Sequence, residues 1–302
     1  MERESVRFFS GDAECVAWYY PGSNGGCVVM AGGFGVTKEP GTDLFAERFQ
    51  RAGFGVLAFD YRRFGESGGG PRQVARVGEQ LADWQAAISY AAERPGVEKV
   101  AIWSFSLSGG YIFPIAARNP QLAAAIAQTP NADGPAASRN AAQHQKPLAM
   151  LRFAGRAVLD AIGSLVGRPP LLVPLVGLPG TVALLTTPDS LQTNEALNPG
   201  NKYSEWIQAV AARSALRITM YRPGRAASRV KVPLLVVVAD QDQTALAQPS
   251  VDAATQAPGA ELLRVPGGHY APFLEEHEVV VEAEITFLTK HLVAQSADPS
   301  RR

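Results

Sequence analysis

The stretch from Lys99 to Gly110, KVAIWSFSLSGG, contains a serine placed where it could act as a nucleophile. An apolar run typical of a buried strand is followed there by the glycine-rich start of a helix, so a tight turn is expected at Ser106. A serine hydroxyl attacks poorly at neutral pH unless it is exposed on a sharp bend beside a base and beside donors for an oxyanion. Ser106 is therefore the predicted nucleophile, and a strand-to-helix turn without chemistry is the alternative.

Such a bend usually carries glycine two residues before and two residues after the serine, so that strand and helix can pass closely. Here Ser104 and Ser108 take those positions, and glycines follow only at Gly109 and Gly110. Serine is the next smallest polar residue, so the bend remains feasible. Ser104 or Ser108 could also be the nucleophile, but Ser104 still belongs to the apolar run and Ser108 already lies in the expected helix.

His269 is the histidine best placed to act as a general base. It follows an apolar run and two glycines, in the segment from Val265 to Tyr270, so its loop can turn the imidazole over the end of a strand. His144 falls in an irregular region, and His277 and His291 fall in the last predicted helix, where an exposed histidine is the ordinary expectation. A neutral imidazole can take the serine proton and return it to a leaving group. A structural loop histidine is the alternative.

An acid that orients the imidazole is expected in the loop Asp240-Gln241-Asp242, directly after a buried strand. In one architecture of serine hydrolases the partners follow in the order serine, acid, histidine, each at the end of a strand, and this position satisfies that order. Asp242 lies deeper in the loop and is favoured, while Asp240 is expected to cap local backbone amides. Asp133 is a third option.

An oxyanion formed at Ser106 would need two backbone N–H groups, one directly after the nucleophile and one after the first parallel strand. We expect them at Leu107 and at Phe34, which follows two glycines. Glycine lets the backbone approach a ligand closely, so Gly33 is also expected to contact the substrate. Trp206, in the irregular region, is a second expected substrate contact. An ordinary glycine turn is the alternative interpretation of the Phe34 loop.

The 302-residue chain has 46% hydrophobic residues and equal numbers of basic and acidic side chains, 28 of each. This balance argues against nucleic acid or an anionic membrane as a partner. The charged start MERESVRFF lacks the apolar core of a signal peptide, so a cytoplasmic protein is expected. No cysteine and histidine spacing matches a metal site, and the loop GGFG is too short for a dinucleotide fingerprint, so no metal and no cofactor are expected.

The order of predicted elements indicates an α/β fold with a mostly parallel central sheet. After an opening hairpin, strand and helix patterns alternate up to about residue 130 and resume at about residue 226. Such alternation gives parallel strands with helices on both faces and a ligand site at the carboxyl ends of the strands. We therefore predict a core of residues 1–130 and 226–293, a lid or cap insertion at 131–225 and a flexible tail at 294–302.

The insertion contains the longest uncharged run of the chain, residues 169–187, which is almost long enough to cross a bilayer. Several prolines and glycines interrupt it, and each interior proline costs a helix about 3 kcal/mol, so no stable membrane insertion is expected. We interpret the run as an apolar, turn-rich part of the lid. Residues 203–220 are predicted to be helical, with Trp206, Ile207 and Val210 on one face.

From about Val28 to Leu292 the chain resembles the α/β-hydrolase superfamily. Within it the chain is most similar to the dienelactone-hydrolase and X-Pro-dipeptidyl-peptidase-like branch, which includes uncharacterised bacterial hydrolases and polyketide acyltransferases. The motifs that carry this resemblance are GGFGVTKE at 32–39, FDYRRFGESGG at 59–69, IWSFSLSGG at 102–110, YRPGR at 221–225, VPLLVVVADQD at 232–242 and VPGGHYAPF at 265–273.

The resemblance implies an α/β-hydrolase fold with a helical lid insertion. It also implies that Ser106, Asp242 and His269 form a catalytic triad, with Phe34 and Leu107 as oxyanion donors. The chain departs from the pattern at the two serines beside the nucleophile, and at Gly32, where many relatives carry histidine.

The expected function is that of a serine hydrolase that cleaves a small-to-medium apolar ester, lactone or thioester through an acyl-enzyme. A leucine-rich lid favours a hydrophobic substrate, although leucines there could simply pack on the sheet. The alternatives are an acyltransferase in a biosynthetic, polyketide-type pathway and a catalytically silent binding module. The expected partner is a small-molecule acyl substrate, and the oligomeric state stays open, with a homodimer among the options.

Overall fold

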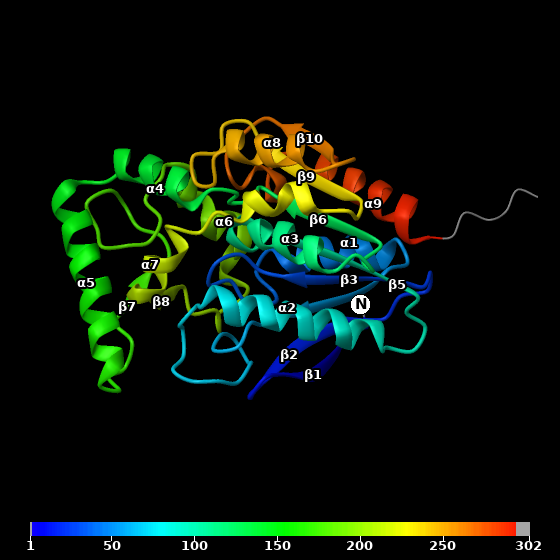
Figure 1. The fold of residues 1–302 in the computed structure, drawn as a ribbon, viewed down its shortest axis with the longest axis horizontal. Coiled ribbons are helices and arrows are strands. Elements are labelled where there is room, and N and C mark those ends of the chain that lie inside the picture. Colours follow the sequence, from blue (N-terminus) through cyan, green and yellow to red (C-terminus); the bar gives the residue numbers. More distant parts are fainter. Residues whose placement is uncertain (1, 294–302) are drawn as a thin grey trace, which may run out of the picture.

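An eight-stranded sheet forms the centre of the molecule in the computed structural model, which describes residues 2–293 (Figure 1). The predicted tail at 294–302 lies outside the described residues. In spatial order the strands are β1 (Glu4–Ser10), β2 (Ala13–Tyr20), β4 (Gly55–Phe59), β3 (Gly26–Ala31), β5 (Lys99–Phe105), β6 (Ala124–Gln128), β9 (Leu234–Ala239) and β10 (Glu261–Val265). β2 runs antiparallel to both neighbours and the other neighbouring pairs are parallel, so the predicted sheet is confirmed.

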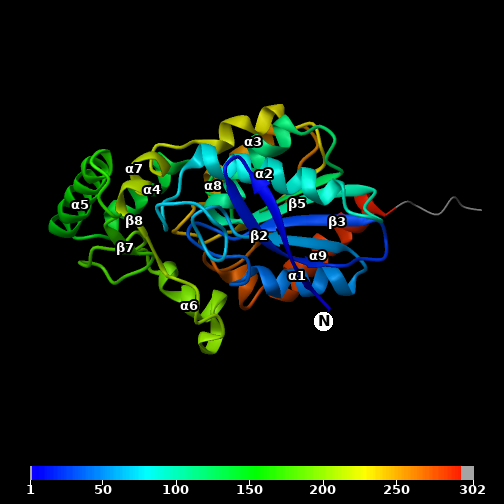
Figure 2. The same ribbon diagram turned by 90° about the horizontal axis from the view of Figure 1, so that it is seen from below.

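Helices cover both faces of this sheet (Figure 2). One face carries α1 (Thr42–Arg51) and α9 (His277–Leu292), and the other carries α2 (Val77–Ala92), α3 (Ser106–Arg118) and α8 (Ala247–Gln256). The central strands are accordingly continuous apolar runs: every residue of β3, β4, β6 and β9 is buried. A strand covered on both faces needs such a run, whereas a half-exposed strand alternates apolar and polar residues.

Parallel strands place their carboxyl ends at one edge of the sheet, and the loops at that edge carry the predicted site residues. Phe34 follows β3, Ser106 follows β5, Asp242 follows β9 and His269 follows β10. The fold therefore brings residues that are far apart in the sequence to one place, which is where ligands bind in open α/β sheets.

Residues 131–225 lie outside the central sheet. They contain the helices α4 (Gly134–Gln143), α5 (Pro147–Leu165), α6 (Thr193–Leu197) and α7 (Ala215–Ile218), and a small antiparallel sheet of β7 (Leu172–Pro174) and β8 (Ala209–Ala211). In Figure 1 α5, α7, β7 and β8 gather at one end of the molecule, beyond the end of the central sheet. That this segment acts as a lid stays a prediction.

The single helix predicted over residues 203–220 is wrong. That stretch contains β8, a short 3-10 turn and α7 instead. Trp206 and Val210 do have helical spacing, but Val210 pairs with Val173 across the small sheet, and the Trp206 indole N–H donates to Gly35 O at 2.8 Å. Tertiary contacts of this kind override a local periodicity.

The long helix α5 is attached to the rest of the molecule by a narrow face. Only Ala149, Ala157 and Asp160 of this helix are buried, whereas Leu151 is 70% and Leu165 84% exposed. The buried face of α5 therefore consists of small or polar side chains, and most of its large apolar side chains face solvent. The burial of apolar surface by α5 itself is small, so neighbouring segments of the insertion must contribute to its attachment. Within the described residues, neither this helix nor any other combines the length and apolarity needed to span a bilayer.

The core contains a buried carboxyl group next to the strand that leads to Ser106. The Trp103 indole N–H of β5 lies 3.1 and 3.0 Å from the two carboxyl oxygens of Glu284 in α9, and both side chains are fully buried. Burial raises the pKa of Glu284 well above its ordinary value. Burial thus favours the protonated, neutral form of this carboxyl group in the folded protein.

Glu284→Gln should change the pH dependence of stability. In the unfolded chain the Glu284 carboxyl group titrates near pH 4.3. Below that pH the group is neutral in both states, and the wild-type free energy of unfolding has its full value. As pH rises from 4.3 toward the raised folded-state pKa, the unfolded state is stabilised by ionisation and the free energy of unfolding falls. The free energy of unfolding of the variant minus that of wild type should therefore increase between about pH 5 and pH 8, by up to ~1.4 kcal/mol per pH unit.

Urea unfolding at several pH values measures this difference. Glu282→Gln, at an exposed position of the same helix, is the control and should show little change with pH. A difference for Glu284→Gln that is constant across the range would contradict the assignment of a neutral carboxyl group.

Candidate active site

The side chains of Ser106, His269 and Asp242 meet at the carboxyl edge of the sheet. His269 Nε2 lies 3.0 Å from Ser106 Oγ, and His269 Nδ1 lies 2.7 Å from Asp242 Oδ2. Both distances are those of hydrogen bonds. The fully buried imidazole thus lies between a hydroxyl and a carboxylate, while Ser106 itself is half-buried.

The turn at Ser106 is strained and closely packed. Ser106 has a φ of 59°, in the left-handed region that residues other than glycine seldom adopt. The following helix approaches the end of β6: a Cβ at Gly109 would lie 2.9 Å from Gln128 O, and a Cβ at Gly110 would lie 2.4 Å from Asn131 O. The glycines that this close packing requires are therefore three and four residues after Ser106.

The two serines that replace the usual glycines brace this turn. Ser104 Oγ donates to Ala31 O at 2.7 Å, which ties β5 to the end of β3. Tyr61 donates to Ser108 Oγ at 3.0 Å and accepts the Trp84 indole N–H at 2.7 Å. Both hydroxyls are buried and bonded to groups other than the imidazole, so Ser106 is the serine of this stretch that faces His269.

His269 is electrostatically suited to hold a proton. Burial is the largest single influence and would lower the pKa of His269, but the charge and hydrogen bond of Asp242 together with the charge of Asp189 outweigh it. The pKa of His269 therefore lies above its ordinary value of 6.5. A protonated imidazole formed during a reaction would be stabilised by the same carboxylates.

Asp242 is the acid that the structure places against the imidazole. Its second oxygen, Oδ1, accepts the backbone N–H groups of Thr244 at 2.9 Å and Ala245 at 2.7 Å. Asp240 was expected to cap local amides, but its carboxylate instead pairs with Arg264 at the surface. The reason is that the Asp240 side chain projects toward the neighbouring strand β10, which carries Arg264.

The remaining sequence candidates have side-chain partners other than Ser106 or His269, or follow a helix of the insertion. Asp133 caps α4 by accepting the Ala136 N–H at 2.8 Å, and His144 follows that helix. His277 and His291 are half-buried, so the expectation that they are exposed is wrong. His277 lies 3.2 Å from Pro272 O through Nδ1 and packs against α1, which explains its burial.

The loop after β3 passes directly beside Ser106. A Cβ at Gly33 would lie 3.0 Å from the Phe105 ring and 3.3 Å from Ser106 Cβ, so glycine is needed for this approach. Phe34 is the next residue of the loop. The N–H of Leu107 belongs to the first turn of α3, where backbone donors have no partner within the helix. The use of Phe34 and Leu107 as oxyanion donors, and of Gly33 as a substrate contact, stays a prediction.

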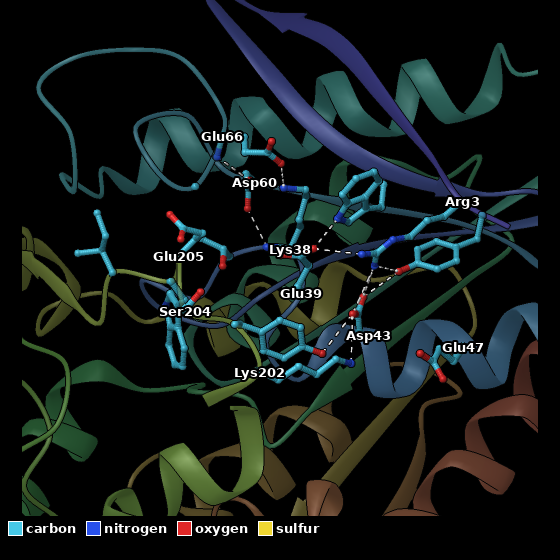
Figure 3. Close-up of a pocket in the computed structure, with 17 residues that line it drawn as sticks. Arg3, Lys38, Glu39, Asp43, Glu47, Asp60, Glu66, Lys202, Ser204 and Glu205 are labelled. Carbon is cyan, nitrogen blue, oxygen red and sulfur yellow. Dashed lines mark hydrogen bonds and ion pairs between the residues drawn. The ribbon is translucent and has the colours of Figure 1, made fainter. Parts of the chain in front are cut away.

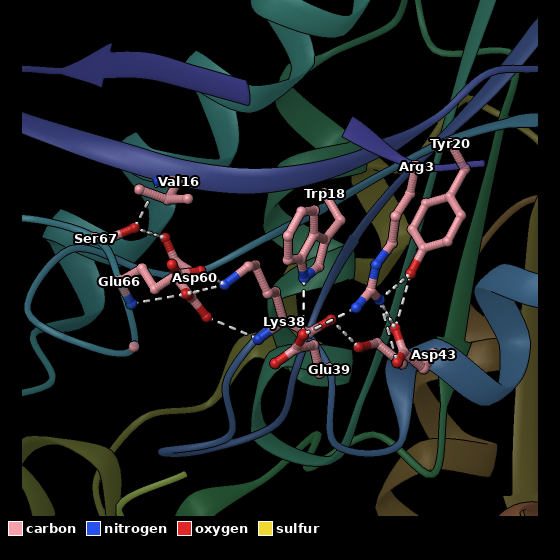
Figure 4. A network of polar contacts seen from close by, with 12 residues as sticks. Arg3, Val16, Trp18, Tyr20, Lys38, Glu39, Asp43, Asp60, Glu66 and Ser67 are labelled. Carbon is pink, nitrogen blue, oxygen red and sulfur yellow. Dashed lines mark hydrogen bonds and ion pairs between the residues drawn. The ribbon is translucent and has the colours of Figure 1, made fainter. Parts of the chain in front are cut away.

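A buried ion pair anchors the far end of this loop (Figure 4). Asp60 accepts the backbone N–H of Lys38 at 2.7 Å and pairs with Lys38 Nζ at 3.0 Å. Asp60 also accepts the Glu66 N–H at 3.0 Å, and the Glu66 carboxylate contacts Lys38 Nζ. Burial would lower the pKa of Lys38, but Asp60 and Glu66 together raise it above its ordinary value. The loop after β3 is thereby tied to the loop after β4.

A cavity of about 840 Å³ lies beside this ion pair (Figure 3). Its charged wall residues are Arg3, Lys38, Glu39, Asp43, Glu47, Asp60, Glu66, Lys202 and Glu205. Within the described chain, its walls include none of Ser106, Asp242 and His269. Trp206 also lines this cavity while its indole holds Gly35 O. Trp206 thus contacts the loop that carries Phe34 at the neighbouring residue Gly35. That Trp206 contacts the substrate stays a prediction.

Sequence reasoning missed the residues that support the site. Lys38 and Asp60 follow parallel strands, and that position was the available signal for a role near the site. Asp189, which bonds to the backbone of the histidine loop at 3.3 Å, lies in the irregular insertion, where no periodic pattern marks it. Residues 2–293 hold no group of three or more histidine, cysteine or acidic side chains arranged for a metal ion.

Comparison with known proteins identifies the family. Residues 22–276 match the family described as serine aminopeptidase, S33. The quorum-quenching protein AidA of Acinetobacter baumannii (strain MDR-ZJ06) is 38% identical over 291 residues, which are 94% of each chain. The polyketide transferase ATR5 of Stachybotrys chlorohalonatus (strain IBT 40285) is 30% identical over 248 residues, 80% of each chain. The chain belongs to this S33 family of α/β hydrolases.

Solved structures agree on the fold. The α/β hydrolase GrgF from Penicillium sp. sh18 superposes with a TM-score of 0.79 at 21% identity, covering 97% of this chain and 99% of that one. DcsB, solved with a substrate analogue, superposes with a TM-score of 0.80 at 19% identity, covering 96% and 99%. The α/β-hydrolase fold predicted from the sequence is therefore confirmed.

Asp60→Asn should destabilise the protein strongly, because it leaves the buried Lys38 ammonium without its main counter-charge. We expect the free energy of unfolding to fall by about 3–5 kcal/mol, measured by urea unfolding at pH 7. Glu66→Gln removes the partner whose side chain is 60% exposed and should cost at most about 1 kcal/mol. Equal losses in the two variants would show that the buried pair does not anchor the loop.

Proposed function

We propose that this protein is a serine hydrolase that cleaves a small-to-medium apolar ester, lactone or thioester through an acyl-enzyme. The observation that carries the proposal is the placement of the His269 imidazole between Ser106 Oγ and Asp242 Oδ2. Hydroxyl, imidazole and carboxylate in this sequence of contacts are the components of a catalytic triad. Membership of an α/β-hydrolase family supports the same reaction class.

In the proposed reaction His269 Nε2 takes the proton of Ser106 Oγ as that oxygen attacks the substrate carbonyl carbon. The carbonyl oxygen becomes an oxyanion and accepts hydrogen bonds from the backbone N–H groups of Phe34 and Leu107. The imidazolium, stabilised by Asp242, then donates its proton to the leaving group, and the carbon–leaving-group bond breaks. The same imidazole then takes a proton from water, whose oxygen attacks the acyl carbon. The bond between this carbon and Ser106 Oγ breaks, the carboxylic acid leaves, and His269 returns the proton to Oγ.

An apolar substrate is favoured by the residues of the insertion that lie on the Phe34 loop. A Cβ at Gly35 would lie 2.8 Å from a Val210 methyl and 2.9 Å from a Leu175 methyl, so these two buried side chains cover the loop directly. The other leucines of the insertion divide between surface and interior: Leu178 is 62% exposed. A substrate that lies against the insertion side of the Phe34 loop would therefore meet aliphatic groups.

Acyl transfer to an alcohol or amine is the second candidate function. It is favoured by relatives whose names describe transferases, such as the polyketide transferase af380 of Aspergillus fumigatus, 26% identical over 315 residues, whereas the thiohydrolase aneE of Aspergillus aculeatus is 40% identical over 93 residues. Both reactions use the same acyl-enzyme and differ in the nucleophile that receives the acyl group. Product analysis with and without an added alcohol or amine distinguishes them. A catalytically silent binding module is the remaining alternative.

Ser106→Ala should abolish turnover of p-nitrophenyl esters and of matched lactones and thioesters. We expect kcat/KM to fall by roughly 10³-fold or more, because the variant keeps binding and oxyanion groups but has no nucleophile. Ser108→Ala is the matched control, since it removes a hydroxyl of the same turn that contacts Tyr61 instead of the imidazole. Ser106→Ala protein that retains the wild-type rate would reject the proposal, and so would equal losses in the two variants.

The pH profile of kcat/KM should report the raised pKa of His269. The base must be neutral to take the serine proton, so kcat/KM should fall as pH decreases through the His269 pKa, with a midpoint above 6.5. Asp242→Asn removes the main group that raises this pKa, and it should move the midpoint to lower pH while lowering the plateau. Initial rates with a p-nitrophenyl ester from pH 5 to pH 9 give the profile. A wild-type midpoint below 6.5 would contradict the assigned electrostatics.

A further inference from the structure

An aspartate of the insertion contacts both loops that carry the proposed acid and base. Asp189 begins a 3-10 turn, η1 (Asp189–Gln192), within residues 131–225. We propose that Asp189 is a positioning residue, which holds the Asp242 loop and the His269 loop together and so makes the geometry of the triad depend on the docked insertion. This inference rests on the proposed function, because it concerns the same site.

The contacts with the acid loop fix the residues directly after Asp242. Asp189 Oδ2 accepts the N–H of Gln243 at 2.7 Å and that of Thr244 at 3.2 Å, and Asp189 Oδ1 accepts the Thr244 hydroxyl at 2.8 Å. The Thr244 N–H is shared with Asp242 Oδ1, at 2.9 Å. Because Oδ1 of Asp242 is held by this backbone, its Oδ2 is left to face His269.

The contacts with the histidine loop come from the same carboxylate. Asp189 Oδ2 also accepts the backbone N–H of His269, at 3.3 Å. A Cβ at Gly268 would lie 3.0 Å from Asp189 Cβ, so the loop can pass this close because residue 268 has no side chain. One oxygen atom thus joins the backbones of two loops that follow different strands. In the described chain, the hydrogen bonds of Asp189 do not reach the imidazole ring, which is why its role is positioning.

Asp189 also adds charge to the surroundings of the imidazole. The charged groups that face His269 are Asp242, from the loop after β9, and Asp189, from the insertion. Tyr270 packs edge-on against the imidazole, and burial raises the pKa of its phenol, which is neutral at physiological pH. The pKa of Asp189 is itself lowered: burial opposes ionisation, but His269 and the donors from Gln243 and Thr244 more than compensate.

Neighbouring residues show that this part of the insertion is docked on the triad loops. Thr187 Oγ1 lies 2.7 Å from Thr244 Oγ1, and Thr193 donates to the Tyr270 hydroxyl at 2.9 Å. Asp189 lies between these two contacts in the sequence. The segment from Thr187 to Thr193 therefore touches both loops, in contrast to the loosely attached α5.

Asp189→Asn tests the proposal with a side chain of the same size. The amide loses the negative charge, so its hydrogen bonds to the backbone are no longer charge-assisted, and if its oxygen keeps the three backbone N–H groups its NH2 must face the Thr244 hydroxyl that now donates to Oδ1. We expect kcat for a p-nitrophenyl ester to fall roughly 10- to 100-fold with KM little changed, because the loops that position the triad are loosened. The acid limb of the kcat/KM profile should also move to lower pH, which loss of structure alone would not produce.

Two further variants make the outcome decisive. Asp240→Asn removes an exposed carboxylate of the same loop and should leave rate and profile as in wild type. Thr244→Val removes the hydroxyl contacts with Asp189 and with Thr187 but keeps the Asp189 carboxylate and its backbone contacts, so it should lower kcat more mildly without moving the acid limb. Circular dichroism shows whether Asp189→Asn folds. If it does not, the kcat of Thr244→Val tests the positioning role of Asp189 instead.

The outcomes separate this inference from the proposed function. Wild-type protein without Ser106-dependent turnover would overturn both. Wild-type turnover together with an Asp189→Asn variant that matches Asp240→Asn in kcat and in its acid limb would overturn the role of Asp189 alone. If Asp189→Asn is unfolded, a Thr244→Val variant with the wild-type kcat would overturn that role.

Discussion

The site depends on an imidazole that is removed from water and held between a hydroxyl and a carboxylate. A buried histidine would ordinarily lose affinity for its proton, and here Asp242 and Asp189 reverse that tendency. Three loops from different strands must therefore hold their positions to within a fraction of an ångström, since the two contacts of His269 are 3.0 and 2.7 Å long. The surrounding contacts keep the side chains of Ser106, His269 and Asp242 at these distances.

The support comes from hydrogen bonds and ion pairs between adjacent loops at the sheet edge. Ser104 joins β5 to β3, Lys38 and Asp60 join the loops after β3 and β4, and Asp189 joins the loops after β9 and β10. Each bond is buried or half-buried, where loss of one partner costs more than at the surface. Substitution of the usual glycines by serine is thus compatible with the fold, because both hydroxyls find partners and two later glycines supply the close packing.

Much of the fold could be predicted from the sequence. Continuous apolar runs identified the buried parallel strands, and the order of strands and helices placed Ser106, Asp242 and His269 at one edge. The insertion could not be predicted in the same way: the helical spacing of Trp206 and Val210 was misleading, because their neighbours across β7 and the Phe34 loop determine the conformation there. Asp189 gave no signal, since its contacts are with residues more than fifty positions away.

The proposed function requires that the activated hydroxyl of Ser106 react with an electrophile. Treatment of the folded protein with a fluorophosphonate, followed by peptide mass mapping, measures this. The account predicts one covalent adduct, on Ser106, that forms in the native protein and disappears when His269 is replaced by alanine. Native protein that forms no adduct, or an adduct on Ser104 or Ser108, would contradict it.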